Sequence, residues 1–277
     1  MSTRILSEAL TGTSVDLPAG TPLLEADGIE LRFGGTRAID GVGFDVRPGE
    51  LFAVIGPNGA GKTSIFNCIS GVYRPQQGSI RFLGAELVGE RPDRIAKRGV
   101  ARTFQNIELF DNLTVVENLM LGRHQHLDYG VLDAMRYLGR ARRAELANRR
   151  IVEDIVDFLE IAAQRKLPVG MLPYGVKKRV ELGRALAMEP KLLLLDEPVA
   201  GMNAEETEDM ARFILDIRSE LDTAMILVEH DMGLVMDLAD RVMVMDFGRR
   251  IALGEPAAVQ ADPAVIQAYL GEPEGST

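Results

Sequence analysis

The chain has 277 residues, a length that suits one large domain or a main domain with a smaller lobe attached. Its 31 basic and 41 acidic residues give a formal net charge of −10 at pH 7, which argues against a general affinity for nucleic acid or anionic lipid. No segment approaches the ~20 consecutive apolar residues of a membrane span, and the first residues lack the apolar stretch of a secretory signal. We therefore expect a soluble, cytosolic protein.

The N-terminal part of the chain predicts a leader followed by short strands. Residues 1–22 mix Ser, Thr, Gly and Pro without a steady period, which is typical of a flexible leader, and we expect the folded domain to occupy residues 23–277. Short apolar runs bounded by Gly or Pro predict strands at residues 24–33, 38–46, 51–55 and 79–82. This part of the chain is typical of an antiparallel β subdomain beside a parallel core.

The remaining elements alternate between helical and strand patterns. Helical spacing over residues 113–163 predicts a separate lobe, with a helical subdomain over approximately residues 106–188. Continuous apolar runs at 191–196 and 224–228 predict strands buried on both faces of a parallel sheet, and residues 205–221 between them have helical spacing. Asp262 and Pro263 suit the cap and first position of a closing helix over residues 263–270.

Residues 56–63 carry the most informative motif, Gly-Pro-Asn-Gly-Ala-Gly-Lys-Thr, between the predicted strand 51–55 and a helical segment. Glycines let successive backbone N–H groups point inward to cradle a triphosphate, and the helix start adds partial positive charge. In the usual form of this loop, Lys62 reaches the β and γ phosphates and the Thr63 hydroxyl ligates Mg²⁺. The predicted nucleotide-binding residues are Gly56, Pro57, Asn58, Gly59, Ala60, Gly61, Lys62, Thr63 and Ser64. Cys68, on the following helix, is the chain's one cysteine and is expected to be buried.

Two adjacent carboxylates end the predicted strand at 191–196. Asp196 at the carboxyl end of the strand can hold Mg²⁺, and Glu197 can accept a proton from an attacking water. The alternative is a pair of solvated acids that open a loop. Five buried strand positions before the first carboxylate favour a site at the edge of a sheet. With the phosphate loop, they predict an α/β fold with a P-loop NTPase core, a mainly parallel sheet, an antiparallel β subdomain and an α-helical subdomain.

These motifs, with others in the same order, resemble the ATP-binding subunits of ATP-binding cassette (ABC) transporters from Leu23 to the C-terminus. The resemblance implies that Gln105 senses the γ phosphate, takes part in binding Mg²⁺ and contacts a membrane partner. It also implies that His230 is the switch histidine and that Phe33 stacks on adenine. Gly175 lies in the segment Leu172–Val176, which has the place of the family signature and closes over ATP held by a second subunit.

Each of these residues also has an ordinary interpretation. Taken singly, Gln105 fits a polar loop residue, His230 a hydrogen-bonded histidine after a strand, and Phe33 a core aromatic. His124 and His126 lack further ligands at metal spacing and are expected to be exposed.

The segment Leu172–Val176 departs from the common Leu-Ser-Gly-Gly-Gln at Pro173, Tyr174 and Val176, and Asn203 replaces a commoner aspartate. These departures put in question how well this subunit completes its partner's site.

Phe33-Gly34-Gly35, the Leu-Pro-Tyr-Gly segment, Val228–Met232 and the C-terminal Ala-Tyr-Leu-Gly-Glu are similar to the ATPases of branched-chain amino acid importers. That similarity implies ATP and Mg²⁺ as cofactors and a peripheral position on the cytoplasmic face of the membrane. The implied partners are two transmembrane permease subunits, a second ATPase or a second copy of this chain, and an extracytoplasmic solute-binding protein, with no nucleic acid. Importers of urea, amides or aromatic acids are alternatives. So are a non-transport ABC ATPase that acts on ribosomes or DNA, and a regulatory module without turnover.

Overall fold

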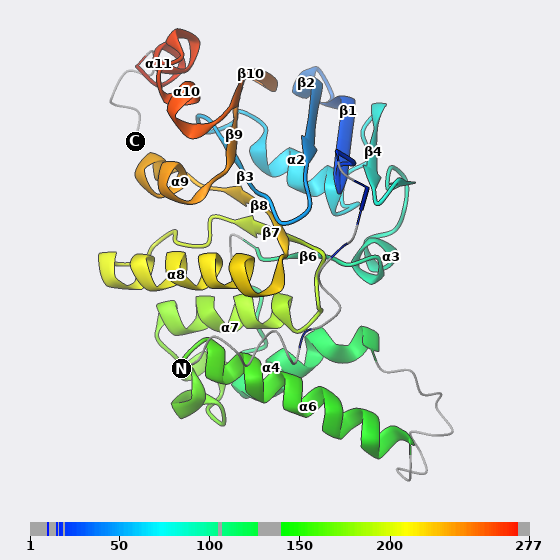
Figure 1. Ribbon diagram of the computed structural model, residues 1–277, viewed down its shortest axis with the longest axis vertical. Helices are drawn as coiled ribbons and strands as arrows, with labels where there is room; N and C mark the ends of the chain where they lie inside the picture. The colour runs from blue at the N-terminus through cyan, green and yellow to red at the C-terminus, as the bar shows by residue number, and fades with distance from the viewer. Residues whose placement is uncertain are drawn as a thin grey trace. The chain divides into compact units, whose positions relative to one another are not determined.

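The computed structural model describes residues 10, 15, 17, 18, 20–104, 107–126 and 140–270 (Figure 1). Most of the predicted leader at 1–22 and all of Gln105 lie outside the described residues. The chain forms two compact units, which we call the helical unit and the sheet unit. The helical unit consists mainly of Thr103–Lys191 and Pro198–Asp222, and the sheet unit of Val15–Arg102, Leu192–Glu197 and Thr223–Thr277.

The sheet unit is built on a six-stranded sheet in the order β10-β9-β3-β8-β7-β6. The strands β6, β7, β8, β3 and β9 are parallel to their neighbours, and β10 alone pairs antiparallel, with β9. Every residue of β3, β7 and β8 is buried, as predicted for strands covered on both faces. Their bounds are β3 Leu51–Ile55, β6 Val100–Arg102, β7 Leu192–Asp196, β8 Ala224–Val228, β9 Arg241–Asp246 and β10 Arg249–Gly254.

A second, antiparallel sheet has the order β2-β1-β4-β5. Its strands are β1 Leu24–Phe33, β2 Thr36–Val46, β4 Gln77–Phe82 and β5 Ala85–Glu86. One hydrophobic core joins both sheets through the helix that follows β3, with Phe52, Phe66 and Phe82 among its fully buried side chains. The predicted combination of a mainly parallel sheet with an antiparallel β subdomain is therefore confirmed.

Five helices belong to the sheet unit among the described residues: α2 Lys62–Ile69, α3 Pro92–Lys97, α9 Met232–Leu238, α10 Pro256–Gln260 and α11 Pro263–Leu270. In α2, Ile65, Phe66 and Ile69 are buried on one face. Cys68 is also buried, and burial raises the pKa of its thiol to about 12. Before α11, Asp262 Oδ1 accepts a hydrogen bond from the Ala264 amide at 2.8 Å.

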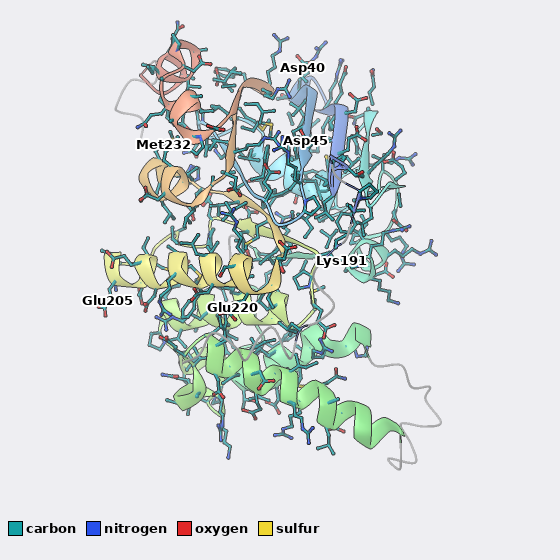
Figure 2. All side chains as sticks on the ribbon, in the orientation of Figure 1. Asp40, Asp45, Lys191, Glu205, Glu220 and Met232 are labelled. Atoms are coloured by element: carbon teal, nitrogen blue, oxygen red, sulfur yellow. The ribbon has the colours of Figure 1, made fainter. Side chains whose placement is uncertain are left out.

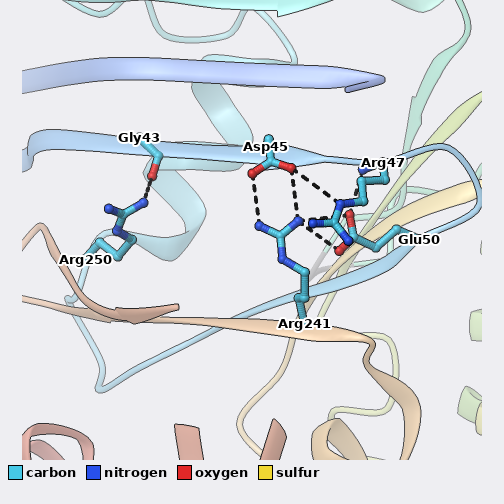
Figure 3. A network of polar contacts seen from close by, with 6 residues as sticks. All are labelled: Gly43, Asp45, Arg47, Glu50, Arg241 and Arg250. Atoms are coloured by element: carbon cyan, nitrogen blue, oxygen red, sulfur yellow. Dashed lines mark hydrogen bonds and ion pairs between the residues drawn. The ribbon is translucent and has the colours of Figure 1, made fainter. Parts of the chain in front are cut away.

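Arginine side chains of the six-stranded sheet form hydrogen bonds with carboxylates of the antiparallel sheet. Arg241 on β9 donates to both carboxylate oxygens of Asp45 on β2 at 3.0 Å and to Glu50 at 3.1 Å (Figure 3). These hydrogen bonds hold the pKa of Asp45 below its ordinary value, whereas burial raises that of Glu50. Asp40, further along β2 (Figure 2), accepts from Arg249 on β10 at 2.8 Å.

The helical unit contains α4 Val115–Gly122, α6 Arg140–Phe158, α7 Tyr174–Leu186 and α8 Ala204–Leu221, with short 3₁₀ turns at Arg123–His126, Ala162–Gln164 and Val169–Met171. Two glycines bring the helices close. A Cβ on Gly122 of α4 would lie 2.4 Å from the Arg184 carbonyl of α7, and one on Gly183 of α7 would lie 2.8 Å from Leu159. The helices α4, α6 and α7 therefore pack tightly. Within the described ranges, no helix is both long and apolar enough to cross a membrane.

Candidate functional site

Three predicted functional segments leave the six-stranded sheet at one edge. Val228 of β8 pairs with Val54 of β3 on one side and with Asp196 of β7 on the other. Because these strands are parallel, the loop after β3, the carboxylates ending β7 and the segment after β8 all start from the carboxyl edge. Residues separated by more than a hundred positions in the chain are brought together in this way, all within the sheet unit.

The loop between β3 and α2 has a backbone that only glycine can follow at two points. Gly56 and Gly61 have φ angles of 145° and 102°. A Cβ on Gly56 would lie 2.1 Å from the Met245 carbonyl oxygen, and one on Gly61 would lie 2.4 Å from that of Ala38. The glycines thus let the loop turn tightly against β9 and β2.

Positive groups gather in this loop. The buried Lys62 ammonium donates to the carbonyl oxygens of Gly56 at 2.5 Å and Pro57 at 2.9 Å, and is held over the loop. No side chain caps the N-terminus of α2, and no acidic residue lies in its first turn. The Thr63 hydroxyl belongs to an exposed residue, and Ser64 is half-buried. A lysine beside an uncapped helix start fits the charge and hydrogen-bonding needs of phosphate groups.

Glu197 and His230 form a close pair at the same edge. His230 Nε2 lies 2.5 Å from Glu197 Oε1, with 44% of the histidine side chain and 10% of the glutamate side chain exposed. Glu197 has a φ of 48°, and its amide donates to the Val228 carbonyl at 2.9 Å, which anchors β7 to β8 just where the pair forms. Both Asp196 and Glu197 are buried, so the alternative of two solvated loop acids is wrong.

Arg102 is a member of this edge that sequence reasoning missed. It ends β6, and its Nη2 lies 2.7 Å from Asp196 Oδ2. Its Nη1 donates to Asn67 Oδ1 of α2 at 2.6 Å and contacts Ser70 Oγ at 3.3 Å. The arginine therefore links the helix after the phosphate loop to the carboxylate of β7. The one signal in the sequence was a basic residue ending a short apolar run, Gly99-Val100-Ala101-Arg102.

Phe33 belongs to the sheet unit and His124 to the helical unit, and both are exposed. Phe33 ends β1, is 48% exposed and packs edge-on against Tyr73, with 5.1 Å between ring centroids. It is therefore no core aromatic, and its exposed ring is open to a stacking partner. His124 is exposed, as expected, in the turn Arg123–His126.

The signature segment lies in the helical unit, where it starts α7. Pro173 occupies the cap position, and Gly175 lies in the first turn, where a Cβ would meet the Glu206 carboxylate at 2.2 Å. Tyr174, which replaces a family glycine, donates from its hydroxyl to the Ala200 carbonyl at 3.0 Å. Asn203 caps α8, because its Oδ1 accepts a hydrogen bond from the Glu206 amide while Glu206 Oε2 accepts one from the Asn203 amide. Pro173, Tyr174 and Asn203 thus each have a local structural role, whereas nothing in the structure explains Val176.

The oxygen donors present suit a magnesium ion. Asp196 supplies a carboxylate at the end of a strand, with Oδ2 held by Arg102, and Thr63 supplies an exposed hydroxyl at the start of α2. Mg²⁺ binds in proteins through one or two carboxylates together with substrate phosphates.

Comparison with known proteins decides the family. The model of the ABC transporter family matches residues 39–200. This chain belongs to the ABC transporter family. A second family model, described as branched-chain amino acid ATP-binding cassette transporter, matches residues 249–275 of this ABC protein.

Three relatives illustrate the match. BraF of Pseudomonas aeruginosa, a high-affinity branched-chain amino acid transport ATP-binding protein, is 40% identical over 91% of this chain and 98% of its own length. LivG of Escherichia coli K12, with the same description, is 38% identical over the same shares. A solved ABC transporter ATP-binding cassette in its ADP conformation is 30% identical with a TM-score of 0.77, covering 91% of this chain and 100% of its own.

Proposed function

We propose that this chain is the ATP-hydrolysing subunit of an ABC importer, and that the imported solute is a branched-chain amino acid. The observation that carries the hydrolytic part is the contact between Glu197 and His230 at the edge from which the phosphate loop also leaves. The solute is supported by the match at residues 249–275 and by the names of the BraF and LivG relatives.

Different residues of the sheet unit bind the phosphates, the adenine and the Mg²⁺ ion of ATP. The backbone of Gly56–Gly61 and the start of α2 cradle the phosphates, and the Lys62 ammonium turns from the loop carbonyls to the phosphate oxygens. The exposed Phe33 ring stacks on adenine. Thr63 and Asp196 hold Mg²⁺, which neutralises charge on the phosphates when bound.

Glu197 and His230 act on the water. The Glu197 carboxylate takes a proton from water as that water attacks the γ phosphate, and His230, in contact with the carboxylate, orients it and the water. Because a glutamate carboxylate at this position is buried, few waters compete for it, and its hydrogen bonds are stronger than they are in bulk solvent.

The helical unit carries the residues that serve partners. Gln105 senses the γ phosphate and contacts the membrane partner, and Gly175 starts the helix that closes over ATP in a second ATPase, which is another chain or a second copy of this one. Two transmembrane permeases and an extracytoplasmic solute-binding protein complete the importer. The chain then lies peripherally on the cytoplasmic face of the membrane.

Uptake by cells tests the proposal. Deleting the gene in its source organism is expected to abolish uptake of radiolabelled leucine, and the wild-type gene is expected to restore it. A gene that encodes Glu197→Gln should restore none, although the protein accumulates to the same level. Labelled urea, an amide and an aromatic acid serve as parallel substrates. Loss of uptake for one of these with normal leucine uptake would reassign the solute, and normal uptake of all four would contradict an importer role.

A further inference from the structure

The hairpin of β1 and β2 carries an exposed aromatic ring at its end. Phe33 is the last residue of β1, and it is 48% exposed. The turn that follows consists of Gly34 and Gly35, which have no side chains to pack against the ring. The orientation of the Phe33 ring therefore depends on contacts with other parts of the chain.

Tyr73 supplies one such contact. Its ring meets that of Phe33 edge-on, with the ring centroids 5.1 Å apart and an angle of 72° between the ring planes. Tyr73 is half-buried and packs against the hydrophobic core of the sheet unit. Because the ring quadrupoles favour an edge-to-face arrangement, this contact restricts the rotation of the exposed ring.

The chain that carries Tyr73 is fixed to the end of α2. The Tyr73 amide donates to the Asn67 carbonyl oxygen at 2.9 Å, and the Ser70 amide donates to that of Phe66 at 2.9 Å. Since α2 begins at Lys62 of the phosphate loop, one short helix connects this loop to the residue that supports the Phe33 ring.

Gln76 holds the backbone immediately before Phe33. Glu30 is the last residue of β1 that pairs with β4, and a continued ladder would place Pro75 opposite Arg32. Proline has no N–H to donate, so the strand cannot continue the pairing there. The Gln76 side chain does so instead: its Oε1 accepts from the Arg32 amide at 2.9 Å, and its Nε2 donates to the Arg32 carbonyl oxygen at 3.2 Å.

Both contacts come from one short segment of the sheet unit, residues 73–76 between α2 and β4. The Gln76 amide also donates to the Glu30 carbonyl oxygen at 2.9 Å, which fixes this segment along β1. Phe33 is therefore held at two points, at its ring and at the backbone that precedes it.

We propose that Tyr73 and Gln76 are positioning residues for the adenine of ATP: Gln76 fixes the backbone before Phe33, and Tyr73 sets the orientation of its ring. This inference rests on the proposed function, in which Phe33 stacks on adenine. A ring already held in the stacking orientation loses less conformational entropy when the base binds, so both residues raise the affinity for ATP through Phe33.

Binding of two probes to the full-length chain tests the role of Tyr73. The probes are MgATP and magnesium tripolyphosphate, which has the same phosphate chain without a base. Tyr73→Leu should raise the Kd for MgATP about 3–10-fold and leave the Kd for tripolyphosphate within about twofold of wild type, since only the aromatic contact is lost. Tyr73→Phe keeps the ring and should bind both probes as the wild type does.

A double-mutant cycle shows whether Tyr73 acts through Phe33. In a chain that already carries Phe33→Leu, adding Tyr73→Leu should change the Kd for MgATP less than about twofold, because the ring that Tyr73 orients is gone. During turnover by the chain with its partners, Tyr73→Leu should raise KM for ATP and leave kcat unchanged, because the base takes no part in the reaction.

Gln76→Leu tests the second contact with a side chain that lies at the surface. It removes both hydrogen bonds to Arg32, so it should raise the Kd for MgATP about threefold and hydrogen exchange at the Arg32 amide about tenfold. Gln77→Leu is the matched control, because Gln77 is the neighbouring exposed glutamine and pairs with β1 through its backbone. It should leave both quantities unchanged.

An unchanged Kd for MgATP in Tyr73→Leu, an equal rise for both probes, or an undiminished effect in the Phe33→Leu chain would overturn the inference while Phe33→Leu itself still weakens ATP binding. If Tyr73→Leu does not fold, Gln76→Leu decides, and a Kd for MgATP equal to that of Gln77→Leu would overturn it. A wild-type Kd for MgATP in Phe33→Leu would instead refute adenine stacking in the proposed function, and the positioning role with it.

Discussion

Replacing Arg102 by methionine should destabilise the protein strongly. Arg102 and Asp196 form an ion pair whose side chains are only 9% and 1% exposed, and the same guanidinium also binds Asn67. Removing one partner of a buried ion pair typically costs about 3–5 kcal/mol, since the remaining charge loses its compensation, and methionine keeps the aliphatic volume of the arginine stem. We therefore expect Arg102→Met to lower the free energy of unfolding by about this amount.

Equilibrium unfolding in urea, followed by circular dichroism, measures the effect. Arg98→Met is the control, because Arg98 forms an exposed pair with Glu90 at 2.7 Å and its loss should matter far less. Arg102→Lys retains a charge but not the planar fork that reaches both Asp196 and Asn67, so it should fall between wild type and Arg102→Met. If Arg102→Met lowers the free energy of unfolding no more than Arg98→Met does, the buried ion pair is not a stabilising contact.

Three further predictions concern single side chains. Lys62→Ala should weaken ATP binding at least tenfold, because each charge-assisted hydrogen bond contributes about 1.5–3 kcal/mol; an unchanged titration with a fluorescent ATP analogue would contradict this. Arg241 holds the pKa of Asp45 below its unfolded value of about 3.9. The free energy of unfolding of the wild type should therefore exceed that of Asp45→Asn by a constant amount near neutral pH, and this difference should shrink as pH falls below about 4. A difference that persists in acid would contradict the prediction. Cys68, with a pKa raised to about 12, should react with a thiol reagent at pH 8 at least a hundredfold faster in urea than in the folded protein; equal rates would argue against burial.

Local patterns sufficed for six strands and for the motif loops, but β9 Arg241–Asp246 and β10 Arg249–Gly254 were not predicted. The strands 24–33, 51–55 and 224–228 have the predicted bounds: the first alternates apolar and polar residues, and the other two are apolar runs ended by Gly or a polar cluster. The carboxyl-edge position of Asp196 followed from the same reasoning, since a buried parallel strand must end where its loop begins. By contrast, β6 spans only Val100–Arg102, too short for any period to emerge.

Polar contacts between residues far apart in the chain could not be predicted from the sequence. Arg102 and Asp196 are 94 positions apart, and nothing local indicates that β6 and β7 are neighbours. Lys178, Glu181 and Arg184 have the spacing of a solvated helix face, yet two of them are buried against Phe104. Charge spacing along a helix predicts which residues share a face and does not predict what covers that face.

The most direct test of the account is single-turnover hydrolysis of radiolabelled ATP by the chain purified together with its ATPase and permease partners in the presence of Mg²⁺, with wild type and Glu197→Gln compared at equal bound nucleotide. The account predicts phosphate release by the wild type and a rate about 10²–10⁴-fold lower in Glu197→Gln, with ATP binding unchanged. Equal rates in the two proteins would contradict it.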